Sequence, residues 1–198
     1  MINELINNMG AWKTLRKSEI KVILIGNRGI ILNNAIGQKV YADGYYGKPI
    51  GVNKPKPNEP FKQPLQLSLY ELIYLLEKGK ITVLNEKNKT VKIETIRKIG
   101  KKTYKDFENK YKVYRDLREK GYIVRPGLKF GADFSVYKHG PGIDHAPFLV
   151  TVYSKDTKLL GIDLIRAGRL ATSVRKKFVI ATIKDNKIKY YVFQWHRP

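Results

Sequence analysis

The stretch from Val113 to Tyr137, VYRDLREKGYIVRPGLKFGADFSVY, is the most informative part of the sequence for the fold. Its first residues continue an apolar pattern with steps of three and four, which predicts an amphipathic helix that ends at Gly121. The segments Tyr122–Val124 and Lys129–Tyr137 contain β-branched and aromatic residues and are predicted to be strands. The stretch therefore predicts a helix that leads directly into a β-sheet.

The sequence after this stretch alternates between predicted strands and one helix. Phe148–Tyr153 is a predicted strand, and apolar residues at helical spacing between positions 164 and 174 predict a helix. Phe178–Ile183 and Ile188–Trp195 are two further strands, joined by the polar turn Lys184–Lys187. We therefore expect a C-terminal domain, residues 105–198, with a central β-sheet and helices around it.

The sequence before the stretch predicts a smaller unit. The apolar runs Glu19–Ile25 and Ile30–Leu32 surround a Gly-Asn-Arg-Gly sequence, which is typical of a β-hairpin. Five prolines between Gly44 and Pro64 predict an exposed, semi-extended loop, because proline lacks a backbone donor and fixes φ. Ser68 and Glu71 have the spacing of a capping box ahead of apolar residues at helical spacing.

The end of this first unit is less regular. The helix that begins at Ser68 is predicted to end at Gly79, and Ile81–Leu84 is a predicted short strand. Thr90–Ile93 is either another strand or the beginning of the next helix, and the charged segment Arg97–Lys105 separates the two halves. We expect an N-terminal α/β domain, residues 1–104, and an overall α/β (α+β) fold class.

The charge of the chain favours a nucleic-acid partner. Its 198 residues include 39 Lys and Arg against 17 Asp and Glu, which gives a formal net charge of +22. A field of this sign attracts polyanions, and contacts with phosphates release condensed counterions. Charge alone leaves open a ribosome-associated structural protein or a protein that binds an anionic membrane surface.

The absence of cysteine excludes disulfides, thiolate zinc sites and cysteine nucleophiles. The first 17 residues lack the apolar core of a signal peptide, and no apolar run is long enough to span a membrane. We therefore expect a soluble, cytoplasmic protein without a membrane partner.

Several catalytic patterns are missing from the sequence. It has no glycine-rich phosphate loop, no dinucleotide-binding glycine pattern and no serine nucleophile elbow. The histidines His139, His145 and His196 do not have the spacing of zinc ligands, and the acidic residues are scattered rather than clustered. We expect neither a metal nor a cofactor, and a metal-dependent nuclease is the alternative.

A cationic protein can cleave RNA without a metal when the 2′-hydroxyl of the substrate attacks its own phosphorus. The protein must then accept a proton from the 2′-oxygen, donate one to the 5′-oxygen and stabilise charge on the non-bridging oxygens. Tyr137, His145 and the run Arg175–Lys177 offer such groups. By residue type alone, each also fits an ordinary structural role: a packed strand end, a loop residue and a solvated basic surface.

Three blocks of the sequence resemble the signature of the tRNA-intron endonuclease family. The first is the stretch from Val113 to Tyr137, with Gly-Leu-Lys-Phe-Gly-Ala-Asp-Phe at its centre and a strand-ending tyrosine. The second is His145 ahead of the apolar Phe148–Val152, and the third is Ser173–Lys177 ahead of an apolar strand. The resemblance is strong over residues 105–198 and looser over the first half. It implies a central mixed sheet of the restriction-endonuclease-like kind.

The resemblance also implies an activity. Members of the family cut precursor tRNA at the bulge-helix-bulge of intron–exon junctions and leave 2′,3′-cyclic phosphate and 5′-hydroxyl ends. Tyr137 matches the general base, His145 the general acid, and Lys176 the lysine that stabilises the transition state. Since the ordinary pKa of tyrosine is near 10, the base needs neighbouring cations. We expect a catalytic subunit, the alternative being a non-catalytic, RNA-binding structural subunit of the same complex.

RNA contacts and an oligomer are further implications of the resemblance. The family holds a bulged base between two arginines, a role that suits flat guanidinium groups. Arg169 matches one of them, Arg197 is the candidate for the other, and Arg175 is a further RNA-binding candidate. Where the family docks an acidic loop on another subunit, the turn Lys184–Lys187 has Asp185 as its one acid. Both a homo-oligomer, such as a homotetramer, and a hetero-tetramer with a structural subunit therefore stay open.

Overall fold

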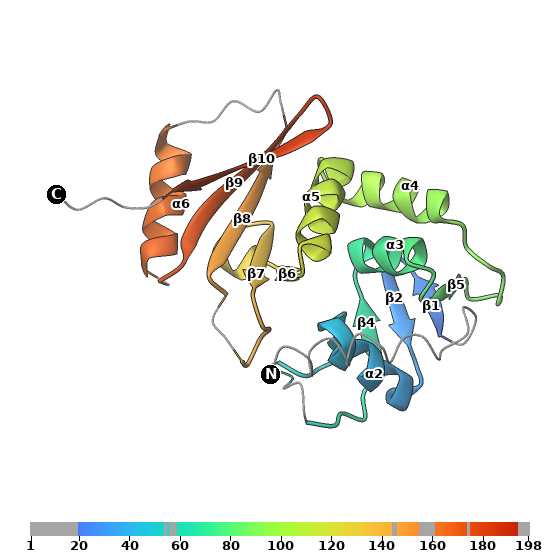
Figure 1. Cartoon of the computed structure of the whole chain (residues 1–198). Coiled ribbons are helices and arrows are strands. Elements are labelled where there is room, and N and C mark those ends of the chain that lie inside the picture. The colour runs from blue at the N-terminus through green and yellow to red at the C-terminus, as the bar shows by residue number, and fades with distance from the viewer. Residues whose placement is uncertain are drawn as a thin grey trace.

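The computed structural model describes residues 20–193 except 54, 56–58, 144–145, 155–160 and 174. Within these residues the chain forms two five-stranded sheets with helices beside them (Figure 1). Each sheet combines antiparallel pairs with one parallel pair, so both are mixed. The α+β fold class expected from the sequence is confirmed. None of the helices in the described ranges is long and apolar enough to cross a membrane.

The first sheet has the strand order β3-β4-β2-β1-β5. Its β1–β2 pair is the predicted hairpin, in which Gly26 adopts a φ of +57° in the turn. A positive φ is accessible to glycine at little cost, which explains why the turn lies there. The strands are β1 (Lys21–Ile25), β2 (Arg28–Ile31), β3 (Lys48–Pro49), β4 (Leu65–Leu67) and β5 (Thr82–Leu84).

The helices of this half are α2 (Asn34–Gly44), α3 (Leu69–Glu77) and α4 (Ile93–Thr103). The start of α3 confirms the predicted capping box. The Ser68 hydroxyl accepts the backbone N–H of Glu71, and the Glu71 carboxylate accepts the Ser68 N–H at 2.7 Å. This reciprocal pair satisfies two backbone donors that a helix start leaves without intrahelical partners.

Two expectations for the first half are wrong in part. The stretch from Gly44 to Pro64 is not a uniformly exposed loop, because it includes the edge strand β3 and buries Tyr45, Tyr46 and Phe61. Its prolines nevertheless keep it out of the centre of the sheet. The expectation also misses α2, whose start is capped by the Asn33 side chain.

The connection to the second half is helical. Thr90 makes only an isolated bridge to Leu84, and α4 follows, so the alternative in which the segment opens a helix is the correct one. The charged segment from Arg97 to Lys105, predicted to separate the two halves, lies mostly within α4. The lysines of this segment are exposed, and α4 packs against α3 and α5.

The second sheet has the strand order β10-β9-β8-β7-β6 and follows α5 (Phe107–Glu119) in the chain. Neighbouring strands are antiparallel except β8 and β9, which are parallel and are connected through α6 (Gly161–Ser173). The strands are β6 (Ile123–Pro126), β7 (Phe134–Tyr137), β8 (Phe148–Tyr153), β9 (Lys177–Lys184) and β10 (Lys187–Phe193).

The predicted strand Lys129–Tyr137 is too long at its beginning. Leu128–Phe130 form a short 3-10 helix, η2, and β7 begins only at Phe134. Gly131 ends η2 with a φ of +61°, a conformation that does not continue a strand. Gly131 therefore indicates a turn, although the aromatic residues around it favour a strand.

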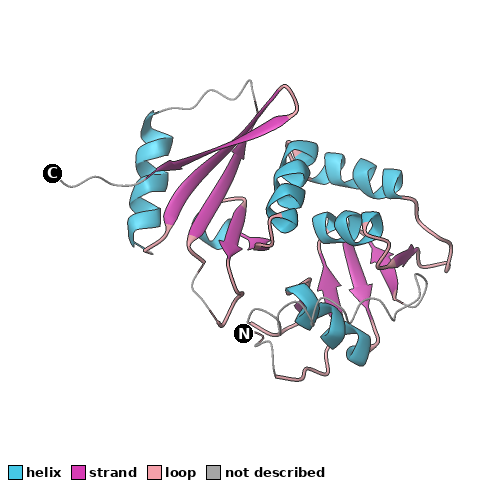
Figure 2. Cartoon of the chain, viewed as in Figure 1, coloured by secondary structure: helices cyan, strands magenta, loops and turns pink. Residues whose placement is uncertain are grey.

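The two faces of the second sheet carry different helices (Figure 2). Leu149 and Ile180 pack with Leu164 of α6. Their chain neighbours Val150 and Val179 belong to the core that includes residues of α5. This division follows from the alternation of side chains along a strand, and it confirms the predicted sheet with helices around it.

A cluster of aromatic rings joins the two halves. Tyr70 of α3 stacks on Phe107 and Tyr114 of α5, with ring centroids 4.9 and 5.9 Å apart. Its ring also meets Phe134 of β7 edge-on at 5.7 Å. The apolar core is therefore continuous from one half to the other. The division into domains of residues 1–104 and 105–198 stays a prediction.

Candidate active site at one end of the second sheet

Three neighbouring strands bring predicted site residues to one end of the second sheet. β7 ends at Tyr137, while β8 and β9 begin at Phe148 and Lys177. Phe148 pairs with both Val136 and Lys177, so the end of β7 and the beginnings of β8 and β9 share one edge. Tyr137 and Lys176, which lie far apart in sequence, are thus at the same end of the sheet.

The Lys176 side chain contacts the segment between β7 and β8. Its Nζ donates a hydrogen bond of 2.8 Å to the carbonyl of Ala146 and lies 5.5 Å from the ring centroid of Phe130. The adjacent backbone holds the same segment, because the N–H of Lys177 donates to the Pro147 carbonyl at 2.9 Å. The half-buried ammonium group is therefore fixed at a position where it can stabilise negative charge.

The turn between α6 and β9 orients Lys176. Arg175 adopts a φ of +54°, and its N–H donates to the Thr172 carbonyl at 3.0 Å. A left-handed conformation costs a residue other than glycine about 1–2 kcal/mol, so the surrounding structure must impose it. The side chains of Arg175 and of Arg169 on α6 are both exposed, where they can meet a polyanion.

Tyr137 shares its surroundings with two other tyrosines and an arginine. Burial raises the pKa of the Tyr41 phenol; the Arg125 guanidinium lowers it, and the Tyr45 and Tyr137 phenols raise it through their charge. The Tyr41 and Tyr45 rings meet edge-on, with centroids 5.4 Å apart, and the Arg125 guanidinium donates to the Tyr45 carbonyl at 2.6 Å. The register of β6 and β7 pairs Ile123 with Tyr137 and Arg125 with Ser135, so Arg125 is a diagonal cross-strand neighbour of Tyr137 on the same face of the sheet.

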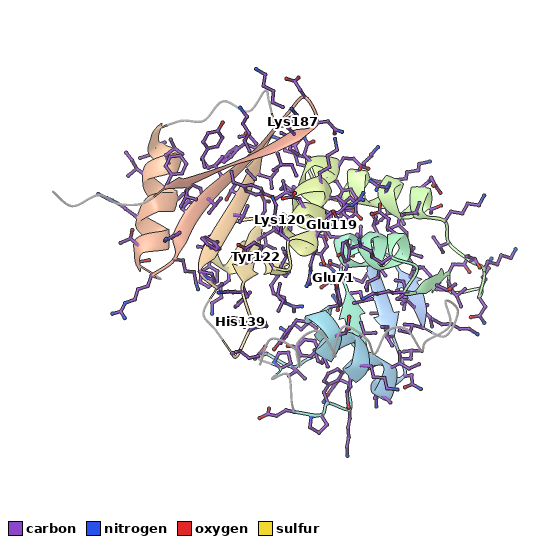
Figure 3. The ribbon with its side chains drawn as sticks, in the orientation of Figure 1. Glu71, Glu119, Lys120, Tyr122, His139 and Lys187 are labelled. Carbon is purple, nitrogen blue, oxygen red and sulfur yellow. The ribbon has the colours of Figure 1, made fainter. Side chains whose placement is uncertain are left out.

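The structure describes only some of the other residues predicted from the sequence. His145 and Arg197 lie outside the described residues. The loop after β7 is described up to Ile143, and Figure 3 shows its His139 beyond the end of that strand. The structure thus brings Tyr137 and Lys176 to one end of the sheet and leaves Arg169 and Arg175 on the surface.

The acidic residue closest in sequence to Tyr137 among the described ones, Asp133, has structural partners. Its Oδ1 pairs with Nζ of Lys110 at 2.6 Å, and its Oδ2 accepts the N–H of Val152 at 2.8 Å. Across the described part of the chain, no group of three or more His, Asp or Glu side chains is arranged to hold a metal ion. The described groups at the end of the sheet are phenols and cations, which suit an anionic ligand.

The turn between β9 and β10 contains the acid expected there. Asp185 and Asn186 adopt φ values of +50° and +60°, which is typical of a two-residue hairpin turn. The Asn186 side chain accepts a hydrogen bond of 3.0 Å from Nζ of Lys112 on α5. Asp185 is exposed, so its carboxylate can reach another molecule.

Sequence reasoning misses several residues of this region. Phe130 contacts the Lys176 ammonium group, and Arg125 donates to the backbone carbonyls of Tyr45 and Gly47 in the first half. No local pattern could find the Arg125 contacts, because their partners are 80 and 78 positions away. The available signal was an arginine directly after the predicted strand Tyr122–Val124, a position that has no special meaning by itself.

Two family models match this chain. The one for the tRNA intron endonuclease, N-terminal domain, matches residues 20–97. The one for the tRNA intron endonuclease, catalytic C-terminal domain, matches residues 107–190. The second range contains the whole end of the sheet at which Tyr137 and Lys176 lie.

Individual proteins are similar to nearly the whole chain. The tRNA-splicing endonuclease of Hyperthermus butylicus is 43% identical over 181 residues, which are 90% of this chain and 99% of that protein. The tRNA-splicing endonucleases of Saccharolobus islandicus and Saccharolobus solfataricus are 39% identical over 178 residues, which are 89% of this chain and 98% of each relative.

Proposed function

The chain belongs to the tRNA intron endonuclease family, and we propose on this premise that it cuts precursor tRNA at intron–exon junctions without a metal ion. The observation that carries the proposal is the hydrogen bond from Lys176 Nζ to the Ala146 carbonyl. It links a fixed cation to the residue that follows His145, at the sheet end where Tyr137 lies. The substrate feature is the bulge-helix-bulge, which is recognised by shape.

The proposed reaction is a transesterification within the RNA. Tyr137 accepts the proton of the 2′-hydroxyl, and the 2′-oxygen attacks the adjacent phosphorus. The P–O5′ bond breaks, and His145 donates a proton to the departing 5′-oxygen. The new O2′–P bond closes a 2′,3′-cyclic phosphate and leaves a 5′-hydroxyl, so no water is consumed.

Lys176 stabilises the extra negative charge on the non-bridging oxygens in this mechanism. Its position is set in advance by the Ala146 carbonyl and the Phe130 ring, so little reorganisation is needed as charge develops. Groups of this kind contribute about 10²–10³ in rate in enzymes that stabilise an oxyanion.

We also propose that arginines hold the RNA. The exposed side chains of Arg169 and Arg175 suit stacking on a base and pairing with phosphates, with Arg197 as the third member of this set. The net charge of +22 supports a large electrostatic contribution to binding. Binding should therefore weaken steeply as the salt concentration rises.

The proposal also concerns the oligomer in which the chain works. We infer that the chain works as a homotetramer or as a hetero-tetramer with a structural subunit, supported by the exposed Asp185 at the β9–β10 turn. Light scattering of the purified chain tests this inference. A tetramer mass supports the first assembly, and a smaller mass that increases only with an acidic-loop subunit supports the second. An active monomer contradicts both.

Lys176→Ala and Lys177→Ala test the function as a matched pair. Both remove one positive charge from the same run, but only Lys176 donates to the Ala146 carbonyl through its side chain. The Lys177 side chain is exposed, and its backbone contact with Pro147 survives the substitution. We expect Lys176→Ala to cleave about 10²–10³ times more slowly with unchanged RNA affinity, while Lys177→Ala cleaves nearly as the wild type.

Two outcomes of this comparison contradict the proposal. Equal losses in the two variants would show that only net charge matters at this end of the sheet. Wild-type cleavage by Lys176→Ala would remove Lys176 from the mechanism. A wild-type chain that binds precursor tRNA but cleaves it only when another subunit supplies the catalytic groups would favour the structural-subunit alternative.

A further inference from the structure

The segment Gly44–Gly47, at the end of α2, is held by two arginines from the second half of the chain. Nη1 of Arg118 donates to the Gly44 carbonyl at 2.7 Å. Nη1 of Arg125 donates to the carbonyls of Tyr45, at 2.6 Å, and Gly47. Three carbonyls of this four-residue segment therefore accept hydrogen bonds from arginine side chains of α5 and β6.

Both arginines are fixed by further contacts. Arg118 is 7% exposed, and its guanidinium lies 4.4 Å from the ring centroid of Tyr46. Arg125 lies 3.7 Å from the carboxylate of Glu71, which itself accepts the N–H of Gly47 at 2.8 Å. Charge-assisted hydrogen bonds in a buried environment are strong and directional, so the segment has one defined position.

That position sets the direction of the Tyr45 side chain. Tyr45 has a left-handed backbone, with a φ of +54°, and its N–H donates to the Tyr41 carbonyl at 2.6 Å. The ring is buried and meets the ring of Tyr41 edge-on, with centroids 5.4 Å apart. A conformation that is unfavourable for tyrosine is thus maintained by the contacts on both of its sides.

The Tyr45 ring reaches the loop that follows β7. A Cβ placed on Gly140 would lie 2.5 Å from the ring carbons Cε2 and Cζ of Tyr45 and 2.9 Å from its hydroxyl oxygen. Gly140 is buried and has a φ of +127°, a conformation that only glycine adopts readily. The loop backbone therefore lies directly against the ring, and both sequence and conformation favour glycine at the contact.

The contact at Gly140 lies between two other attachments of the same loop. The loop begins after Tyr137, which pairs with Ile123 in the sheet. Near the other end of the loop, the Ala146 carbonyl accepts a hydrogen bond from the Lys176 ammonium group. Tyr45 adds a contact from the first half of the molecule. His145 belongs to this loop in sequence, five positions after Gly140.

We propose that Tyr45 is a positioning residue for RNA cleavage: its backbone carbonyl accepts a hydrogen bond from Arg125, and its ring supports the loop after β7 at Gly140. The inference rests on the proposed function, because the loop matters through His145 as the general acid. It assigns the first half of the chain a part in the reaction. Misplacement of a catalytic group by about 1 Å can reduce a rate about a hundredfold.

The test compares Tyr45→Ala and Tyr45→Phe with Phe61→Ala. Phe61 is a matched control, because its buried ring also packs edge-on against Tyr41, at 5.9 Å, but faces Gly37 instead of Gly140. Single-turnover cleavage of precursor tRNA, its dissociation constant and the unfolding temperature are measured for each protein. All rates are taken at a temperature at which every variant is folded.

We expect Tyr45→Ala to cleave about 10- to 100-fold more slowly, with a dissociation constant within about threefold of the wild type. Tyr45→Phe should restore the rate, since it keeps the ring, and Phe61→Ala should lose stability but not rate. Equal rates for Tyr45→Ala and the wild type would contradict the inference. So would a comparable loss of rate in Phe61→Ala, since that would make the effect a general consequence of a weakened core.

Gly140→Ala tests the same contact from the loop side and leaves Tyr45 in the core. We expect it to slow cleavage, because the added Cβ would overlap the Tyr45 ring and because a φ of +127° strains any residue other than glycine. Wild-type cleavage by Gly140→Ala would contradict the inference. A wild-type chain that fails to cleave in the assembly identified by light scattering contradicts the proposed function and this inference with it. Wild-type cleavage with unaffected variants contradicts this inference alone.

Discussion

The two sheets have the same number of strands, but their surroundings differ. In the first half, the helix that follows β4 is capped by Glu71, and this buried carboxylate also holds Gly47. In the second half, one end of the sheet carries the Tyr137 phenol and the Lys176 ammonium group. In the proposed mechanism, the first half supplies stability and positioning, and the chemistry takes place at one end of the second sheet.

This comparison predicts that substitutions in the two regions have different effects on cleavage and on stability. Changes at the end of the second sheet should abolish cleavage and leave the fold intact. Changes in the core of the first half should unfold the protein and leave the rate of the folded molecules unchanged, with Tyr45 as the exception. A substitution at any position other than Tyr45 that lowers both the stability and the cleavage rate of the folded molecules would contradict this division of roles.

The largest effect is expected for His145→Ala. Loss of a general acid typically slows a reaction about 10²–10⁴-fold, because the 5′-oxygen must leave as an alkoxide. A substrate with sulfur in place of that oxygen does not need protonation on leaving. We expect the sulfur substrate to restore cleavage by His145→Ala but not by Lys176→Ala, as measured by single-turnover rates.

The pH dependence of cleavage tests the assignment of His145 as the general acid. Deprotonation of His145 removes the acid and so lowers the slope of log rate against pH by one unit above the imidazole pKa, which is ordinarily near 6.5. In His145→Ala this change of slope should be absent. A wild type and a variant with the same slope throughout would contradict the role of His145.

The next largest effect is expected for Leu72→Ala, and it concerns stability. Leu72 of α3 is fully buried, and the substitution should lower the free energy of unfolding by about 2–5 kcal/mol. Leu32→Ala is the matched control, because Leu32 is 61% exposed in the same half. Chemical denaturation measures both, and the cleavage rate of folded Leu72→Ala should equal that of the wild type. A slower folded enzyme would contradict the separation of roles.

The smallest effect is expected for Arg169, and it concerns binding. Base stacking on a side chain contributes about 1–3 kcal/mol, so Arg169→Ala should raise the dissociation constant of precursor tRNA about tenfold. Arg169→Lys keeps the charge but loses the flat guanidinium group. If Arg169→Lys binds as the wild type does, the contact is with phosphate, and the proposed base sandwich is wrong.

Local signals explain which elements could be predicted from the sequence. The β1–β2 hairpin and the capped start of α3 depend on neighbours within a few positions, as with Ser68 and Glu71. By contrast, the Gly44–Gly47 segment is fixed by Arg118 and Arg125, 74 to 80 positions away. The prolines around the segment predict exposure, whereas these distant partners and Glu71 hold it in a buried position.

The candidate site shows the same limit. The sequence blocks predict Tyr137 and Lys176, and the strand register explains why they lie at one end of the sheet. The Tyr45 contact with Gly140 has no local signature, because the ring comes from the first half of the chain. A glycine at position 140 is compatible with any tight turn, so sequence alone gives no reason to connect it with Tyr45.

The most direct measurement is cleavage of an intron-containing precursor tRNA in excess EDTA, with analysis of the new ends. It uses the wild-type chain in the assembly identified by light scattering. Our account predicts cleavage at the intron–exon junctions, with 2′,3′-cyclic phosphate and 5′-hydroxyl ends. Activity that disappears in EDTA and returns with a divalent cation, or products with 5′-phosphate ends, would contradict a metal-free reaction at the end of the second sheet.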